Sequence, residues 1–388
     1  RAFGYAGVAL YEALVPGMAG YQSLYGQVNE MPSMPPVGSV ASHWPTVANN
    51  TLANVLDKLF RDGSSESRSR ISNLRRYFND QYGGALPQKV FALSRARAQA
   101  VSSQILRWSD RDGYRELDNC GYTPLSGPGY WEPTAPAYAG ALQPCWGQVR
   151  PFALSSTPMC DPGPPPAYSE DTSSQFYHEA LKVYEAVANL TPEQLDIALF
   201  WADNPGQTAT PPGHSLSILT QILVIEDAGL ELAAESYAKL GMAVADAFIS
   251  CWWSKFYYHL LRPITFNRRM FDASWLPPVV TPPFPEYTSG HSVQSGAAAA
   301  TLTALFGDVA FVDHTHDARG MAPRSFSTFY EFADEAAISR LYGGIHFRSA
   351  IDLGVEQGKC IGEQINALDF RGAAPLSGRP GGTLGARR

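Results

Sequence analysis

The sequence has no apolar run of the roughly eighteen residues that a membrane-spanning helix needs, so we expect no membrane segment. Charged residues make up only 17% of the 388 residues, and the net charge is −7 with Lys and Arg scattered along the chain. This pattern lacks the basic stripe typical of nucleic-acid binding, so we expect no such partner. Strand patterns are also scarce. We therefore expect a mainly α-helical protein with a large core.

Apolar residues recur at three- and four-residue intervals along much of the chain, which is the pattern of helices that bury one face. One helix start is visible where a capping Thr191 precedes Pro192. The sequence predicts helices over 5–14, 47–60, 87–107, 173–188, 192–202, 215–254 (two helices), 334–340 and 346–368.

The segment 118–170 is rich in Pro and Gly and cannot stay helical for long. We expect an ordered loop, because Tyr130, Trp131, Trp146 and Phe152 give it apolar surface to bury against the helices.

The five cysteines allow at most two disulfides and one free thiol. Cys120, Cys145 and Cys160 lie in this loop, where a bridge would stabilise irregular backbone. Cys251 and Cys360 lie in predicted helices, where they can simply be buried. The sequence leaves the pairing open.

Three short segments far apart in the chain carry cations, imidazoles and a hydroxyl. The first contains Lys255 and Arg262, and the run 251–261 has neither Gly nor Pro. We expect the two cations on one face of a helix, two turns apart, with Pro263 disfavouring its continuation.

The second segment is Ser289-Gly290-His291, followed by small residues that predict a helix. The first turn of that helix would present free N–H groups to an anion, and Gly290 would let the backbone come close.

The third segment contains Arg340 and His346, with Gly343-Gly344 between them. We expect one helix to end at Arg340 and the glycine turn to reverse the chain, so that His346 opens a final helix. Both side chains can then meet at one point.

These three segments together supply the positive charges and hydrogen-bond donors that bind a tetrahedral, multiply charged oxyanion. Each motif on its own is more often a solvated helix face, a turn or a structural histidine. Here the residue types, their order along the chain and their spacing all fit an oxyanion site at once. The three segments must also converge in one domain. We therefore expect a single α-helical domain over 1–388, with a cage for phosphate or vanadate within 252–352.

The order of these motifs resembles the signature shared by vanadium-dependent haloperoxidases and by type 2 phosphatidic-acid and bacterial acid phosphatases. The sequence around these motifs is similar to that of the bacterial vanadium haloperoxidases, especially iodoperoxidases, in the segments 129–134, 201–203, 283–287 and 313–317. This resemblance covers most of the chain. It implies an all-α architecture of helical bundles, with the Pro/Gly-rich segment as a loop region.

The resemblance also implies vanadate as the cofactor, with His346 as the axial vanadium ligand and His291 as acid and base toward hydrogen peroxide. Vanadium(V) would serve as a Lewis acid that polarises the O–O bond, so that a halide attacks an electrophilic oxygen. Lys255 would sharpen that polarisation. The equatorial oxygens would be held by Lys255, Arg262, Ser289, the Gly290 N–H and Arg340.

Two aromatic residues favour the peroxidase branch over the phosphatase branch. Trp252 and Phe284 match haloperoxidase positions that wall the halide side of the pocket, although both can also be ordinary core residues. Related phosphatases tend to have an Asp four residues after the last His, and this chain has Ala350 there. The orienting partner of His346 is therefore open. Thr288 stands where much of the group has Pro, with an expected effect on the turn only.

Further polar residues surround these motifs. Asp203 looks like the family's carboxylate that pairs with Arg340, although a loop or helix-cap role is an equal alternative. We expect a structural role for His214. The run 313–317 could pass for a metal site, but a hydrogen-bonded turn is favoured.

We conclude from the sequence that the chain is a vanadate-dependent haloperoxidase that oxidises halide with hydrogen peroxide, iodide or bromide before chloride. The alternatives are an acid phosphatase with His346 as nucleophile and a non-catalytic oxyanion-binding protein. An organic halogen acceptor and a monomer or small homo-oligomer are compatible with this reading. The chain opens inside a helix-like segment, so we expect an upstream leader before Arg1 and a periplasmic or secreted location.

Overall fold

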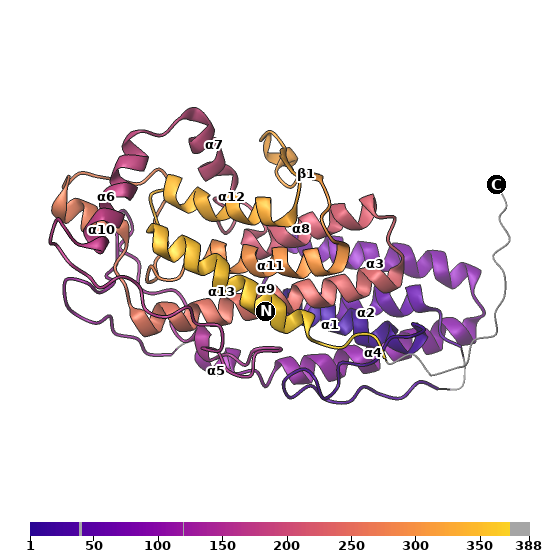
Figure 1. Ribbon diagram of the computed structural model, residues 1–388. Coiled ribbons are helices and arrows are strands. Elements are labelled where there is room, and N and C mark those ends of the chain that lie inside the picture. Colours follow the sequence, from indigo (N-terminus) through magenta and orange to yellow (C-terminus); the bar gives the residue numbers. More distant parts are fainter. Residues whose placement is uncertain (39–40, 119, 373–388) are drawn as a thin grey trace, which may run out of the picture.

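The computed structural model describes residues 1–38, 41–118 and 120–372 and is built mainly of α-helices (Figure 1). The two short strands, β1 (Phe311–Asp313) and β2 (Arg324–Phe326), pair antiparallel. The α-helices are α1 (Ala2–Leu14), α2 (Trp44–Leu59), α3 (Ser65–Ala85), α4 (Gln88–Ser109), α5 (Tyr114–Leu117), α6 (Gln175–Ala188), α7 (Pro192–Phe200), α8 (Thr210–Ile225), α9 (Leu230–Tyr258), α10 (Pro263–Met270), α11 (Gly290–Phe306), α12 (Phe329–Tyr342) and α13 (Arg348–Asn366). Short 3₁₀ turns are η1 (Val15–Gly17), η2 (Trp146–Gln148) and η3 (Asp317–Arg319).

The centre of the molecule is formed by α9, which packs against α1 on one side and α11 on another (Figure 1). Helix α11 in turn lies against α12 and α13. Glycines allow the close approach of α11 and α13, since a Cβ at Gly358 would lie 2.1 Å from the carbonyl oxygen of Val293. This central group of helices carries most of the residues that the sequence assigns to the oxyanion cage.

Most of the expected helices are confirmed within a few residues, and the two expected helices within 215–254 are α8 and α9. Helix α3 is missing from the sequence prediction because it buries none of its residues and so has no apolar stripe. Its start is instead marked by Ser64, whose side chain accepts a hydrogen bond from the N–H of Ser67.

The Pro/Gly-rich loop is ordered over its described residues, and Trp131 and Phe152 are buried as expected. Tyr130 departs from that expectation, because 42% of it stays exposed.

Four of the five cysteines are paired. Disulfides join Cys120 to Cys145 within the loop and Cys160 to Cys360 between the loop and α13. Cys360 is therefore not simply buried, whereas Cys251 is a buried free thiol.

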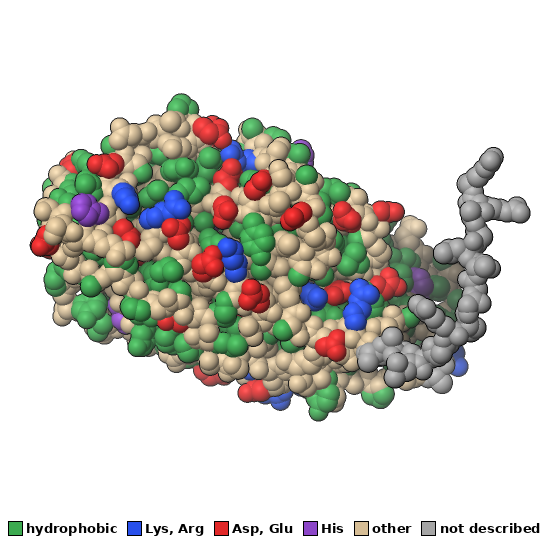
Figure 2. Space-filling model, viewed as in Figure 1, with side chains coloured by type: hydrophobic (Ala, Val, Ile, Leu, Met, Phe, Trp, Pro, Cys, Tyr) green, Lys and Arg blue, Asp and Glu red, His purple; other side chains and the backbone are tan. Residues whose placement is uncertain are grey.

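Acidic and basic side chains are interspersed on the face drawn in Figure 2, with no large region of one sign. None of the helices in the described ranges is long and apolar enough to cross a membrane.

Candidate active site

The two cations of the first segment lie on different helices. Lys255 is in the last turn of α9, which ends at Tyr258 before His259 adopts a left-handed backbone with φ 52°. Arg262 is the N-cap of α10, and Pro263 takes the first position of that helix. The prediction of a shared helix face is therefore wrong, because the left-handed backbone at His259 ends α9 before Arg262, which caps the next helix. Lys255 and Arg262 are nevertheless both fully buried.

The ammonium group of Lys255 is held by backbone carbonyls. Its Nζ donates to the carbonyl oxygens of Pro285 at 3.0 Å, Glu286 at 2.8 Å and Thr288 at 2.5 Å. These bonds use all three ammonium protons. Burial lowers the pKa of Lys255 to about 7. Lys255 thus fixes the turn before α11, and it must release one carbonyl to donate to an anion.

Arg262 lies beside the expected metal-binding imidazole. Its Nε donates to the Phe284 carbonyl at 2.8 Å, and its Nη1 donates to the Ile345 carbonyl at 2.9 Å. Nη1 is also 3.1 Å from Nε2 of His346. Nη2 is buried and has no hydrogen-bond partner among the described residues. Because burial lowers the pKa of Arg262 only to about 10, the guanidinium stays charged at neutral pH.

His346 has an orienting partner that the sequence did not reveal. Its Nδ1 lies 2.8 Å from Oε1 of Glu286, and the same oxygen accepts the N–H of Phe347 at 2.9 Å. The pairing makes Nδ1 the protonated nitrogen and leaves a lone pair on Nε2. Burial and the charges of Arg262 and Lys255 hold the pKa of His346 well below its usual value, so the ring is neutral.

Glu286 corrects the inference drawn from Ala350. Ala350 offers no side-chain acceptor. The Glu286 carboxylate, from the segment before α11, instead accepts the hydrogen bond from His346 that an Asp at position 350 would accept. Burial raises the pKa of Glu286 to about 7, while Lys255 and Arg262 oppose that rise. Oε2 of this carboxylate is buried without a partner in the described chain.

The start of α11 is placed as predicted. Ser289 is its N-cap, and the hydroxyl oxygen accepts the N–H of Ser292 at 3.4 Å. Gly290 opens the helix, and a Cβ added there would make only ordinary contacts of 3.6 Å or more. Packing against the protein therefore does not itself require glycine at this position.

His291 follows directly, and its buried Nε2 has no partner among the described residues. Burial, reinforced by the charge of Arg340, holds the pKa of His291 well below its usual value. The imidazole is therefore neutral and able to accept a proton.

The glycine turn brings Arg340 and His346 to the same cavity, as predicted. Arg340 lies in the last turn of α12, and Gly344 takes a φ of 70° in the reversal. A Cβ at Gly344 would also lie 2.8 Å from Cβ of Pro277, so the positive φ and this close contact both disfavour a side chain at this position. Arg340 donates to the Ala198 carbonyl at 3.2 Å.

A cavity of about 550 Å³ opens onto these groups. Its inner end is lined by Gly290, His291, Arg340, His346, Trp252 and Phe284. The rings of Trp252 and Phe284 are 4.7 Å apart, and the indole N–H donates to the Leu142 carbonyl at 3.3 Å. With that N–H occupied, the wall beside the anion site is apolar. The Arg262 guanidinium and Lys255 ammonium lie 4.9 and 5.2 Å from the Phe284 ring centre.

Asp203 makes no hydrogen bond to Arg340 in the described structure, which corrects that expected contact. Instead, its Oδ2 lies 2.8 Å from Nδ1 of His214, whose Nε2 lies 2.7 Å from Oδ2 of Asp313. His316 Nε2 is 3.3 Å from Oδ1 of Asp203, within ion-pair distance but not aligned as a hydrogen bond. Asp203, His214, Asp313 and His316 thus form one buried polar cluster.

His214 offsets part of the negative charge of the two carboxylates in the cluster. Burial alone would lower the pKa of His214, but its two carboxylate partners raise it to about 9, so the ring is an imidazolium. Burial opposes ionisation of Asp203, yet the hydrogen bond from His214 holds its pKa well below the usual value. Ligand atoms of Asp203, His214 and His316 lie within 4.8 Å of one another, a spacing that a cation could use. Since both nitrogens of His214 donate to carboxylates, that ring has no lone pair for a metal.

The anion site fits a vanadate group. Arg340 lines the cavity, and Lys255 and Arg262 are buried behind the Phe284 ring that also lines it. Nη2 of Arg262 and Nε2 of His291 are polar atoms without partners in the described chain. Nε2 of His346 carries the lone pair that an oxophilic metal requires, and it would exchange its hydrogen bond from Nη1 of Arg262 for the metal. Such unpaired buried groups are costly unless a ligand satisfies them.

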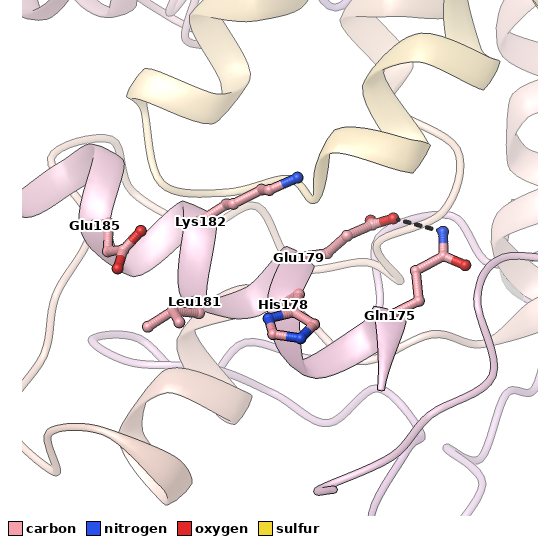
Figure 3. A pocket seen from close by; sticks show the side chains of 6 residues that line it. All are labelled: Gln175, His178, Glu179, Leu181, Lys182 and Glu185. Carbon is pink, nitrogen blue, oxygen red and sulfur yellow. Dashed lines mark hydrogen bonds between the residues drawn. The ribbon is translucent and has the colours of Figure 1, made fainter. Parts of the chain in front are cut away.

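A second hollow, of about 450 Å³, lies along α6 (Figure 3). Two of its polar residues are hydrogen-bonded locally: Gln175 donates to Glu179, and Glu179 accepts the hydroxyl of Ser349. This surface feature has no part in the oxyanion cage.

Comparison with known proteins identifies relatives of the chain as a whole. Residues 267–370 match the family model of the VCPO second helical-bundle domain. A crystal structure of a bacterial vanadium-dependent iodoperoxidase is 38% identical, with a TM-score of 0.87 over 94% of this chain and 89% of that one. A bacterial vanadium-dependent chloroperoxidase shares the fold at 16% identity, with a TM-score of 0.71 over 95% and 90% of the two chains. No curated protein sequence matches the chain.

The chain belongs to the vanadium-dependent haloperoxidases, and its all-α helical-bundle fold is the fold of that family. It is therefore an enzyme that acts on halide with hydrogen peroxide.

Proposed function

We propose that this haloperoxidase oxidises iodide most efficiently, bromide less so and chloride least, with vanadate held between His346 and the buried cations. The observation that carries this proposal is the geometry of His346: Glu286 fixes Nδ1, and Nε2 accepts a hydrogen bond from Nη1 of Arg262 that it would exchange for the metal. Bound vanadate would supply Lewis-acid polarisation of hydrogen peroxide.

The residues around the anion have separate tasks. Arg262 and Arg340 stay charged and offset the negative charge of the oxyanion, while Ser289 and the Gly290 N–H donate hydrogen bonds. Lys255 supplies a further proton if it exchanges one backbone carbonyl for an anion oxygen.

The proton from hydrogen peroxide passes to His291 in this proposal. The ring is neutral, and its Nε2 faces no competing partner among the described residues. A neutral, positioned imidazole is suited to general-base catalysis.

The preference for iodide rests on chemistry and on similarity. Iodide is the easiest of the three halides to oxidise, and the iodoperoxidase is 38% identical in sequence to this chain. Trp252 and Phe284 give the halide side an apolar wall, which suits a large, weakly hydrated anion.

A second activity, hydrolysis of an activated phosphate ester by the metal-free protein, is favoured by Glu286. A carboxylate that orients an imidazole is the arrangement of a histidine nucleophile, and phosphate has the same tetrahedral shape as vanadate.

We also propose a periplasmic or secreted location and a single functional domain. The two disulfides suit an oxidising compartment. A single domain is supported by an anion site whose residues come from α9, α11, α12 and the N-cap of α10.

The halide proposal is tested by steady-state kinetics of the vanadate-loaded enzyme with each halide at fixed hydrogen peroxide. The expected order of kcat/KM is iodide, bromide, chloride. A kcat/KM for chloride equal to that for iodide would overturn the assignment.

A further inference from the structure

A short segment of the Pro/Gly-rich loop lies against the apolar wall of the anion site. We call residues 142–148 the strap; its cavity-lining members are Leu142, Gln143 and Trp146. The end of the strap, η2, packs on α9. A Cβ at Gly147 would lie only 2.5 Å from the backbone nitrogen of Trp253, the residue after Trp252. The strap therefore rests directly on the turn of α9 that carries the wall.

The backbone of Leu142 is tied to both aromatic residues of the wall. Its carbonyl oxygen accepts the indole N–H of Trp252 at 3.3 Å. Its own N–H donates at 2.9 Å to the carbonyl oxygen of Pro283, the residue before Phe284. The two ring centres are 4.7 Å apart. One residue of the strap thus fixes the orientation of the indole and its place beside Phe284.

Two features hold the strap in position. A disulfide joins Cys145, three residues after Leu142, to Cys120. Between them, Gln143 has a φ of 46°, in the left-handed region that favours glycine. A residue with a side chain keeps such a backbone only where its surroundings enforce it. Because Leu142 is 47% exposed, the strap lies at the surface and can move into solvent when this constraint is removed.

Movement of the strap would change the chemistry of the wall. The indole N–H of Trp252 would lose its acceptor, and an N–H in an apolar wall then seeks another one. A halide in the cavity is such an acceptor. Bromide is smaller than iodide and has the higher charge density, so it gains more from a hydrogen bond. Release of the strap would therefore favour bromide relative to iodide.

We propose that the strap is a determinant of halide specificity: the Cys120–Cys145 disulfide keeps Leu142 on Trp252, and Leu142 keeps the indole N–H away from the halide. Leu142 and the two cysteines are positioning residues, because they act through Trp252. The proposal rests on the proposed oxidation of halide beside this wall.

The test compares two pairs of substitutions in the full chain. Cys120→Ser with Cys145→Ser removes the disulfide of the strap. Cys160→Ser with Cys360→Ser removes the other disulfide and is the matched control, since none of these four residues lines the cavity. Circular dichroism checks that both variants fold, and dialysis with vanadate should give affinities within about twofold of the wild type.

Exchange of the Trp252 indole N–H with solvent deuterium is followed by NMR on the metal-free protein, with Trp252→Phe to assign the signal. The N–H should be protected in the wild type and in the control. It should exchange at least about tenfold faster without the strap disulfide. A wild-type N–H that exchanges as fast as that of free tryptophan, or equal rates in the two variants, would overturn the proposal. The wild-type measurement decides this even if a variant does not fold.

Halide kinetics of the vanadate-loaded enzymes complete the test. The ratio of kcat/KM for iodide to that for bromide should fall at least about threefold without the strap disulfide and stay within about twofold in the control. In a Trp252→Phe background, removal of the strap disulfide should leave the ratio unchanged, because no indole N–H remains to be released. An unchanged ratio in the first variant, or an equal fall in the Trp252→Phe background, would contradict the proposal.

Failure of the proposed function would appear differently. A loaded wild type that oxidises neither halide would overturn that function and with it the halide role of the strap. Unequal indole exchange rates would still show that the disulfide positions Trp252.

Discussion

His346 and Glu286 lie 60 residues apart in the chain, yet Nδ1 of the imidazole is 2.8 Å from Oε1 of the carboxylate. The contact fixes which nitrogen carries the proton and turns the other toward the buried cations. It also raises the basicity of the ring, as carboxylate partners do for metal-binding histidines.

Replacing this carboxylate should weaken vanadate binding. Glu286→Gln keeps an acceptor oxygen but removes the charge, and the expected loss in vanadate affinity is about 10- to 100-fold. Equilibrium dialysis followed by elemental analysis measures it. Glu12→Gln is the control, because Glu12 is equally buried but accepts from Ser23 and Leu24, away from the anion site. Equal vanadate affinity of Glu286→Gln and wild type would show that Glu286 does not tune His346.

His291 is predicted to act on protons and not on retention of the anion. His291→Ala should keep vanadate, because Arg262, Arg340 and His346 remain, but should lower kcat for halide oxidation by about 10²- to 10⁴-fold. The affinity comes from dialysis and the rate from triiodide formation. An intact kcat in this variant would remove His291 as the base.

The apolar wall should set the response to different halides. Trp252→His or Phe284→His introduces a polar ring beside the anion site and should change the ratio of iodide to bromide turnover while vanadate is retained. Elemental analysis checks retention, and parallel kinetics give the ratio. If both halides lose activity equally, the two rings are ordinary core residues.

The cluster around His214 should make stability depend on pH in a defined way. The pKa of His214 is raised from 6.5 to about 9, so its stabilising charge is fully present below about pH 6.5 and is lost as the pH rises through 9. A rise of this size corresponds to roughly 3 kcal/mol, as an upper estimate. The pKa values of Asp203 and Asp313 are lowered, so these two carboxylates affect stability at acidic pH. Their contribution is lost as the pH falls below their usual pKa range.

Denaturant unfolding of His214→Gln and wild type measures this effect. The difference in free energy of unfolding should be largest between about pH 5 and 6.5, should shrink as the pH rises from 6.5 to 9, and should be lost above about pH 9. A difference that stays constant over this range would mean that His214 is not charged in the folded protein.

The cage could be predicted from the sequence because the Lys, Arg and His residues that form it are the same residues that define the sequence motifs. Glu286 was missed because a carboxylate among Pro and aromatic residues carries no spacing signal, and its partner lies on a different element. The link from His214 to Asp313 spans 99 residues and was invisible for the same reason.

Fold prediction failed where local patterns were ambiguous. Apolar periodicity found the helices that bury a face, but α3 buries none of its residues. Pro263 is compatible with ending one helix or starting another, and the structure shows that it starts α10 after α9 has already ended at Tyr258. The bridge between Cys160 and Cys360 spans 200 residues and depends on the tertiary fold.

The central claim is that vanadate bound at His346 switches on halide oxidation. Metal-free protein is titrated with orthovanadate while iodide oxidation by hydrogen peroxide and hydrolysis of an activated aryl phosphate are followed in the same samples, with His346→Ala as the control. Iodide oxidation should rise saturably with vanadate as any phosphate hydrolysis falls, and His346→Ala should show neither activity. Fast phosphate-ester turnover with no vanadate-dependent iodide oxidation would contradict the account.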